Sequence, residues 1–258
     1  MKKVLFIALL LISLVSVSVV NATDGYYYSD RSGDPADSSS AYPDNSNTDS
    51  DFSMPVKLVQ IATADTGVTF STRSVLVVVG QTLNIKAFSG FSNSYAFVGD
   101  DNFNSLFNQA SVLKTYKFSG DAIKAGLAEA KIVKDGAMVD RLGVQVVNPY
   151  VVEENANKQT ISMPQYTWLM IKLNGNPTTG YDWQLVSAGA NINIADSGYM
   201  LNAAAIANKM TGAPSKKYYL IQAVAAGTAK LTLQYTRPWD ANSVVGNYEL
   251  TIEVAAGA

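Results

Sequence analysis

The sequence predicts an all-β protein built from two antiparallel β-sandwiches in tandem. From Val56 onward, the chain consists of short β-rich runs separated by turn residues. Several runs alternate apolar and polar side chains; Leu231, Leu233 and Tyr235, for example, fall on one face of a strand whose other face is polar. This alternation is typical of an antiparallel strand with one buried face. Many short strands at close spacing favour a sandwich.

The runs expected to form strands are rich in β-branched, aromatic or other apolar residues and are bounded by turn residues. They cover residues 56–62, 75–79, 83–88, 114–118, 128–133, 142–147, 159–162, 168–173, 182–186, 216–223, 229–235 and 248–254. Two segments, residues 103–112 and 203–210, favour short helices instead.

The two halves of this region resemble each other, which predicts two copies of one sandwich. Residues 122–128 parallel residues 223–229, because in both a Gly turn leads into an alternating strand. Chance likeness between two β-sandwiches is the alternative. We expect one domain at residues 55–150, of open binding role, and a second at residues 151–258.

The N-terminus has the pattern of a secretory signal peptide at residues 1–22. Lys2 and Lys3 precede an apolar run of about 17 residues, and the small residue Ala22 ends the segment. A run of this length is at the lower limit for a spanning helix, so an uncleaved anchor is the alternative. Cleavage predicts a protein without a membrane segment. It would be secreted or otherwise extracytoplasmic, in a periplasm, outside the cell or in a secretory or lysosomal compartment.

Residues 23–54 differ in composition from the rest of the chain. They are rich in Asp, Ser, Tyr, Asn and Gly, and Arg31 is their only basic residue. No apolar periodicity continues through them, which predicts a disordered acidic spacer. The cluster at residues 26–28, three consecutive tyrosines, could instead form a contact.

The composition excludes several classes of function. The chain has no Cys and no His, so Ser-His-Asp and Cys-His catalysis and the usual zinc ligand sets are excluded. The net charge is −2 without a basic stripe, so nucleic acid is not an expected partner. We expect no catalytic residues, metal or cofactor. Asp240 and Glu249 are an alternative carboxylate pair for hydrolysis, but no cleft pattern accompanies them.

Three loops of the second half carry the candidate binding residues. The first contains Asn176, Pro177, Thr178, Thr179, Gly180 and Tyr181. Its proline fixes φ, its glycine can take positive φ, and its β-branched threonines are stiff, so we expect a rigid protruding tip. An ordinary tight turn is an equal alternative.

The other two loops follow later in the same half. One contains Gly212, Ala213, Pro214 and Ser215, and the other contains Arg237, Pro238, Trp239 and Asp240. Trp and Arg are the residue types that dominate binding hot spots, which makes the last loop a candidate contact. The alternative is a Trp239 folded back over the end of the sandwich.

About residues 155–258 resemble the chagasin-type inhibitors of papain-family cysteine peptidases, which have an immunoglobulin-like β-sandwich. That family is marked by an N-P-T-T-G loop, a G-x-G-G loop and an R-P-W loop. The first motif is intact at residues 176–180 and the third at residues 237–239. The second is altered, since only Gly212 remains, while Pro214 removes an N–H donor and Ser215 disfavours positive φ. We therefore expect altered affinity or enzyme range.

The resemblance implies a function and a mechanism. The three loops would lie at one end of the sandwich and form a wedge, with Thr178 and Thr179 entering the catalytic cleft. Trp239 would pack on one side of the cleft and residues 212–215 on the other. Inhibition would be reversible, non-covalent and competitive, by a monomer whose partner is a papain-family cysteine peptidase.

An extracellular or cell-surface binding or adhesion module is the alternative function, since such sandwiches host many activities. An inhibitor needs the Thr and Trp loops together and exposed, whereas a glycan binder needs several aromatics along one face. The first half lacks the motifs. Its counterpart to the Thr loop is residues 88–94, and a tight turn at residues 134–136 stands where Arg-Pro-Trp would fall.

Overall fold

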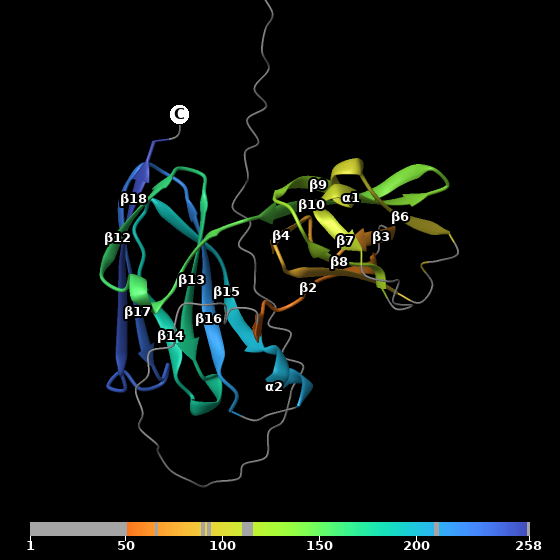
Figure 1. Cartoon of the computed structure of the whole chain (residues 1–258). Helices are drawn as coiled ribbons and strands as arrows, with labels where there is room; N and C mark the ends of the chain where they lie inside the picture. Colours follow the sequence, from red (N-terminus) through yellow and green to blue (C-terminus); the bar gives the residue numbers. More distant parts are fainter. Residues whose placement is uncertain are drawn as a thin grey trace, which may run out of the picture. The chain divides into compact units, whose positions relative to one another are not determined.

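The computed structural model describes residues 51–64, 67–88, 91, 94–109, 116–208 and 212–256 (Figure 1). The expected signal peptide and all but the end of the expected spacer lie outside these residues. Among the residues described, no helix is long and apolar enough to cross a membrane. Residues 51–256 belong to one compact unit, in which the prediction of an all-β fold is confirmed.

The first sandwich consists of two sheets, with strand orders β3-β2-β5-β8-β7 and β4-β10-β9-β6. Its elements are β2 (Lys57–Ala64), β3 (Gly67–Phe70), β4 (Ser74–Val78), β5 (Thr82–Ala87), β6 (Tyr95–Gly99), α1 (Asp101–Leu106), β7 (Phe107–Gln109), β8 (Tyr116–Ala122), β9 (Gly126–Lys134) and β10 (Ala137–Val147). The core between the sheets is aliphatic and aromatic and includes Leu83, Ile85, Phe103 and Ile132, each 1% exposed or less.

The second sandwich also has two sheets, with strand orders β1-β15-β16-β13-β11 and β12-β18-β17-β14. Its elements are β1 (Phe52–Ser53), β11 (Tyr150–Val152), η3 (Glu154–Ala156), β12 (Gln159–Pro164), β13 (Trp168–Gly175), η4 (Pro177–Thr179), β14 (Asp182–Ser187), β15 (Ile192–Asn202), α2 (Ala203–Ala207), β16 (Ser215–Ala223), β17 (Gly227–Thr236) and β18 (Gly246–Ala255). Leu231 and Leu233 are buried in its core, as their alternation predicts.

The two sandwiches share one topology. The sheet order β2-β5-β8-β7 corresponds to β11-β13-β16-β15, and β4-β10-β9-β6 corresponds to β12-β18-β17-β14. Each corresponding pair of neighbours has the same sense, parallel or antiparallel. An internal duplication would produce this correspondence.

The sheets are mixed, whereas the sequence predicted antiparallel sheets. β2 pairs with β5, β4 with β10, β11 with β13 and β12 with β18 in parallel. The reason is topological, because an early strand of each half lies beside a strand reached only after the chain has crossed over. Alternation of apolar and polar side chains along a strand indicates which face is buried. It does not indicate whether the neighbouring strand runs parallel or antiparallel.

Three local predictions differ from the structure. The helix expected at residues 103–112 is α1, which ends at Leu106 before the chain becomes strand β7. Its start is capped by Asp100, which accepts a hydrogen bond from Phe103 N, and buried Phe107 then joins the aromatic core. The end of the expected spacer forms β1. Tyr150 belongs to β11 of the second sandwich, so the first sandwich ends at Val147.

Candidate functional site

Strand register brings the three predicted loops to one end of the second sandwich. Gly175, at the end of β13, pairs with Ser215 at the start of β16, and Leu201 near the end of β15 also pairs with Ser215. In the facing sheet, Asp182 at the start of β14 pairs with Thr236 at the end of β17. In Figure 1 the loop after β13, helix α2 and the β17–β18 connection all lie at the lower end of this sandwich.

The first loop is a single 3-10 turn with capped ends. Asn176 Oδ1 accepts hydrogen bonds from Thr178 N at 3.1 Å and from Thr178 Oγ1 at 2.6 Å. Gly180 follows at φ +78°, a left-handed conformation that glycine adopts without steric penalty. Because a side chain closes the start of the turn and a glycine its end, the tip has a defined shape before any partner arrives.

The two threonine hydroxyls donate within the loop. Thr178 Oγ1 donates to the Asn176 side chain, and Thr179 Oγ1 donates to the Asn176 carbonyl at 2.7 Å. Both threonines are exposed, together with Pro177. The loop therefore offers methyl groups and hydroxyl oxygens that accept hydrogen bonds, because the hydroxyl protons are already engaged.

Asn176 also ties the first loop to the second. Its Nδ2 donates to the Gly212 carbonyl at 3.1 Å, and a β-carbon placed on Gly212 would lie 3.8 Å from Thr178 Oγ1. Gly212 itself lies at φ +72°. Ser215, predicted as a contact residue, is 2% exposed and its Oγ donates to the Gly175 carbonyl at 2.8 Å. Ser215 therefore supports the loop and contributes no exposed side chain.

The third loop is a closed turn that holds Trp239 outward. Asp240 N donates to the Arg237 carbonyl at 2.9 Å. Ser243 Oγ accepts from Arg237 N at 2.8 Å and donates to the Asp240 carbonyl at 2.6 Å. Trp239 is 73% exposed, so its side chain is not part of the sandwich core. Asp240 closes the turn; Arg237 and Pro238 are exposed.

The first and third loops are in direct contact. The Trp239 ring lies against the backbone of Gly180. The Arg237 guanidinium lies 4.7 Å from the centre of the Tyr181 ring, within the range of a cation–π contact. Of the predicted residues, Asn176, Gly180, Tyr181, Ala213 and Asp240 are half-buried, and Pro214 is exposed.

An aromatic cluster beneath the loops was missed by the sequence reasoning. Tyr235 lies 5.4 Å from Tyr181 and 5.2 Å from Trp183, measured between ring centres. Tyr235 Oη accepts a hydrogen bond from Asn176 N at 3.2 Å. The signal available was the place of Tyr235 at the end of an alternating strand, two residues before Arg237. Strand alternation alone predicted only that it faces inward.

A charged network supports the same end of the sandwich. Lys217 Nζ lies 3.1 Å from Asp182 Oδ2, and Tyr199 donates a hydrogen bond to the other carboxylate oxygen. Burial, and then the hydrogen bond to Asp182, raise the pKa of Tyr199 well above its usual value. Tyr199 therefore stays a neutral donor, and the network joins β14, β15 and β16.

The predicted absence of a metal site and the alternative carboxylate pair can be compared with the side chains of the described residues. No group of three or more acidic side chains gathers there to hold a metal ion. Glu249, the partner of the alternative carboxylate pair, is engaged by Lys230 at 2.8 Å, while Asp240 Oδ1 accepts from Asn242 N at 3.0 Å. These contacts leave both carboxylates in structural roles.

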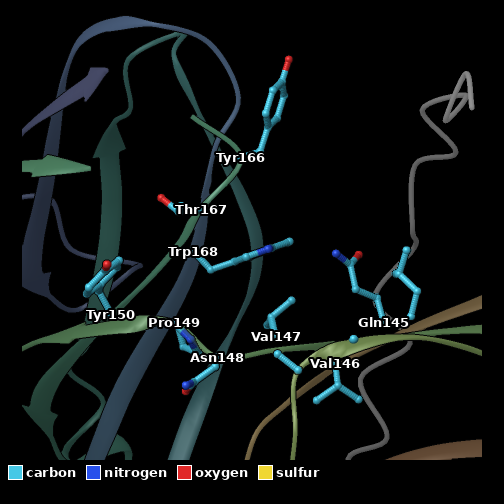
Figure 2. A pocket seen from close by; sticks show the side chains of 12 residues that line it. Gln145, Val146, Val147, Asn148, Pro149, Tyr150, Tyr166, Thr167 and Trp168 are labelled. Atoms are coloured by element: carbon cyan, nitrogen blue, oxygen red, sulfur yellow. The ribbon is translucent and has the colours of Figure 1, made fainter. Parts of the chain in front are cut away.

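A pocket of about 590 Å³ lies by the start of β13, at the end of that strand away from the three loops. Figure 2 shows Trp168 extending over Val147 toward Gln145, whereas Tyr150 and Tyr166 point in different directions. None of the predicted contact residues line it. The candidate site is thus a protruding surface and not a cavity.

The described connection between β9 and β10 of the first sandwich is not a counterpart of the third loop. Its β9 and β10 are joined by Asp135 and Gly136, at φ +52° and +80°, as a tight hairpin. The expected tight turn at this position is confirmed.

Comparison with known proteins places the second sandwich in a family. The family model "Chagasin family peptidase inhibitor I42" matches residues 163–254. Amoebiasin-1 of Entamoeba histolytica is 31% identical over 101 residues, which are 39% of this chain and 95% of Amoebiasin-1.

Two solved structures are also similar. The cysteine protease inhibitor EhICP2 from Entamoeba histolytica is 19% identical and has a TM-score of 0.37, over 41% of this chain and 95% of that one. The solution structure of Amebosin is 29% identical and has a TM-score of 0.33, over 41% of this chain and 96% of Amebosin. With the family model matched and nearly all of Amoebiasin-1 covered, the chain belongs to the chagasin family of peptidase inhibitors, which are not enzymes.

Proposed function

We propose that the second sandwich is a reversible, non-covalent, competitive inhibitor of papain-like cysteine peptidases that blocks the active-site cleft with three loops. The observation that carries the proposal is the convergence of the loops at one end, with Thr178, Thr179 and Trp239 exposed. The matched family is one of peptidase inhibitors, which supports an inhibitory role, and the similar protein EhICP2 is described as a cysteine protease inhibitor.

The loops are suited to binding because they are held before a partner arrives. Asn176 caps one tip and bonds to the next loop, while Ser243 closes the third. A preformed surface loses little conformational entropy on association, so more of the contact energy appears as affinity. Exposed Trp239 beside Arg237 has the composition of a binding hot spot.

The conformation of the first loop favours blockade over cleavage. Pro177–Thr179 form a 3-10 turn followed by Gly180 in the left-handed region. A peptide recognised as an added strand is extended. A turn closed at both ends therefore presents no extended segment for cleavage. The inhibitor would dissociate from the cleft without being cleaved.

The chemistry at the tip also defines what the enzyme must supply. The threonine hydroxyl oxygens accept hydrogen bonds, so a cleft that donates N–H groups at that point is the complementary partner. We propose a monomeric inhibitor that acts in an extracytoplasmic compartment. An adhesion role is less favoured: a glycan binder would present its aromatic side chains together, whereas exposed Tyr150 and Tyr166 point in different directions (Figure 2).

Titration of papain with the full chain tests the proposal. We expect residual activity to fall with inhibitor concentration, the apparent inhibition constant to rise linearly with substrate, and activity to return on dilution. The inhibitor should remain uncleaved on a gel. Absence of inhibition at micromolar concentration would reject the proposal, and inhibition independent of substrate concentration would reject its competitive mechanism.

A further inference from the structure

The inhibitor sheet includes a strand from far earlier in the chain. Phe52 pairs with Asn202 and Ser53 with Leu201, so β1 extends the sheet beyond β15. These partners are the last two residues of β15, and α2 and the Gly212 loop follow them directly. β1 therefore adds hydrogen bonds at the base of the loop in which the family motif is altered.

Side chains around β1 fix it to the outer face of the sheet. Phe52 and Met54 pack against a cluster that includes Met200, Tyr218 and Leu220, which are at most 4% exposed. The Lys216 ammonium lies 5.4 Å from the centre of the Phe52 ring. Without the β1 segment, part of this apolar cluster would face water, which costs about 25 cal/mol for each Å² exposed.

An ion pair holds the chain just after β1. Lys57 Nζ lies 2.6 Å from Asp196 Oδ2, and Tyr218 Oη donates to the same oxygen at 3.0 Å. Asp196 lies on β15, and Tyr218 lies on β16, the strand that the Gly212 loop enters. Both strands that carry this loop are thus joined to residues 52–57.

Resting on the proposed function, we propose that residues 52–54 are a positioning segment of the inhibitor, which holds the base of the Gly212 loop. In the G-x-G-G pattern, backbone freedom and N–H groups lie in the loop itself. Here Pro214 removes one N–H donor from the loop. The conformation of the loop therefore depends more on the strand ends of β15 and β16 that carry it. The inhibitory unit is accordingly discontinuous, and a fragment that begins at residue 150 lacks part of it.

The test compares Phe52→Ala with Phe52→Leu in the full chain. The matched control is Val56→Ala, since Val56 is 51% exposed and lies outside the paired residues. Phe52→Ala should raise the inhibition constant for papain about threefold or more, Leu should recover most of the loss, and the control should change nothing. Amide exchange at Leu201 and Asn202 should accelerate in Phe52→Ala alone.

Double variants separate positioning from general destabilisation. The effect of Phe52→Ala should shrink when Pro214→Gly has already loosened the middle loop, and should add fully to that of Trp239→Ala. Full additivity with both variants, or unchanged exchange and affinity in Phe52→Ala, would overturn the inference. Exchange is measured on the free chain, so it decides whether β1 holds the loop even if papain is not inhibited.

Discussion

The indole ring of Trp239 lies directly on Gly180, so that a β-carbon on Gly180 would be 2.7 Å from Trp239 Cη2. These residues are far apart in the sequence and belong to two separate motifs. Their contact makes the N-P-T-T-G and R-P-W loops one surface, in which the position of the Trp depends on the absence of a side chain at Gly180.

Gly180→Ala should therefore damage both the loop and its neighbour. Positive φ costs an alanine about 1 kcal/mol, and the methyl group would also displace Trp239. Gly136→Ala is the matched control, because Gly136 has φ +80° and open space around it. Urea unfolding should show a similar strain penalty for both variants, whereas only Gly180→Ala should weaken papain inhibition. Equal inhibition by the two variants would contradict the contact.

Trp239→Ala should weaken inhibition by about 2 kcal/mol or more, since a large exposed aromatic at an interface is a typical hot spot. Its free energy of unfolding should change by about 0.5 kcal/mol at most, because the side chain is 73% exposed. Tyr166→Ala removes an aromatic of 66% exposure away from the loops and should leave the inhibition constant unchanged. If both variants inhibit like the parent chain, Trp239 is not a contact residue.

Two substitutions at Asn176 should separate its two roles. Asn176→Ala removes the cap on the 3-10 turn and the bond to Gly212, whereas Asn176→Asp keeps an acceptor for Thr178 N and loses only the donor. Loss of the cap costs about 1 kcal/mol, so the Ala variant should be the weaker inhibitor and the less stable protein. Equal losses measured for the two variants would assign the whole effect to the bond with Gly212.

The pKa of the Glu249 carboxyl should depend on its contact with Lys230. The hydrogen bond and charge of Lys230 lower the pKa of Glu249, so their stabilising effect is present above the usual glutamate pKa and is lost as pH falls through the lowered value. Carboxyl NMR titration of Lys230→Met should show a higher pKa. Lys158→Met should raise it less, because Lys158 is the weaker cause. The opposite order would contradict the assignment.

The sequence alone was sufficient to predict many of the strands and two of the three loops of the candidate site. Strand positions such as those around Leu231 and Leu233 followed from alternation, because burial on one face imposes a period of two. The sequence also showed the likeness of the two halves and the absence of His and Cys. It identified the loops at residues 176–180 and 237–239, because turn formation depends on local residue types.

Other features depended on contacts between distant segments. Alternation does not specify a strand's neighbour, so the parallel pairs and the addition of Phe52 and Ser53 to β15 could not be predicted. Strand β15 was not predicted, because the polar residues around Asp196 and the register shift there interrupt the alternation of apolar and polar side chains.

The site shows the same division. Local sequence identified Asn176, Thr178 and Trp239 as residues for a rigid, exposed surface. Only the tertiary structure decided that Trp239 rests on Gly180, that Tyr235 supports Asn176, and that Ser215 is buried. The physical reason is that backbone conformation depends mainly on adjacent residues, whereas burial and hydrogen-bond partners depend on strand register and sheet packing between residues distant in the chain.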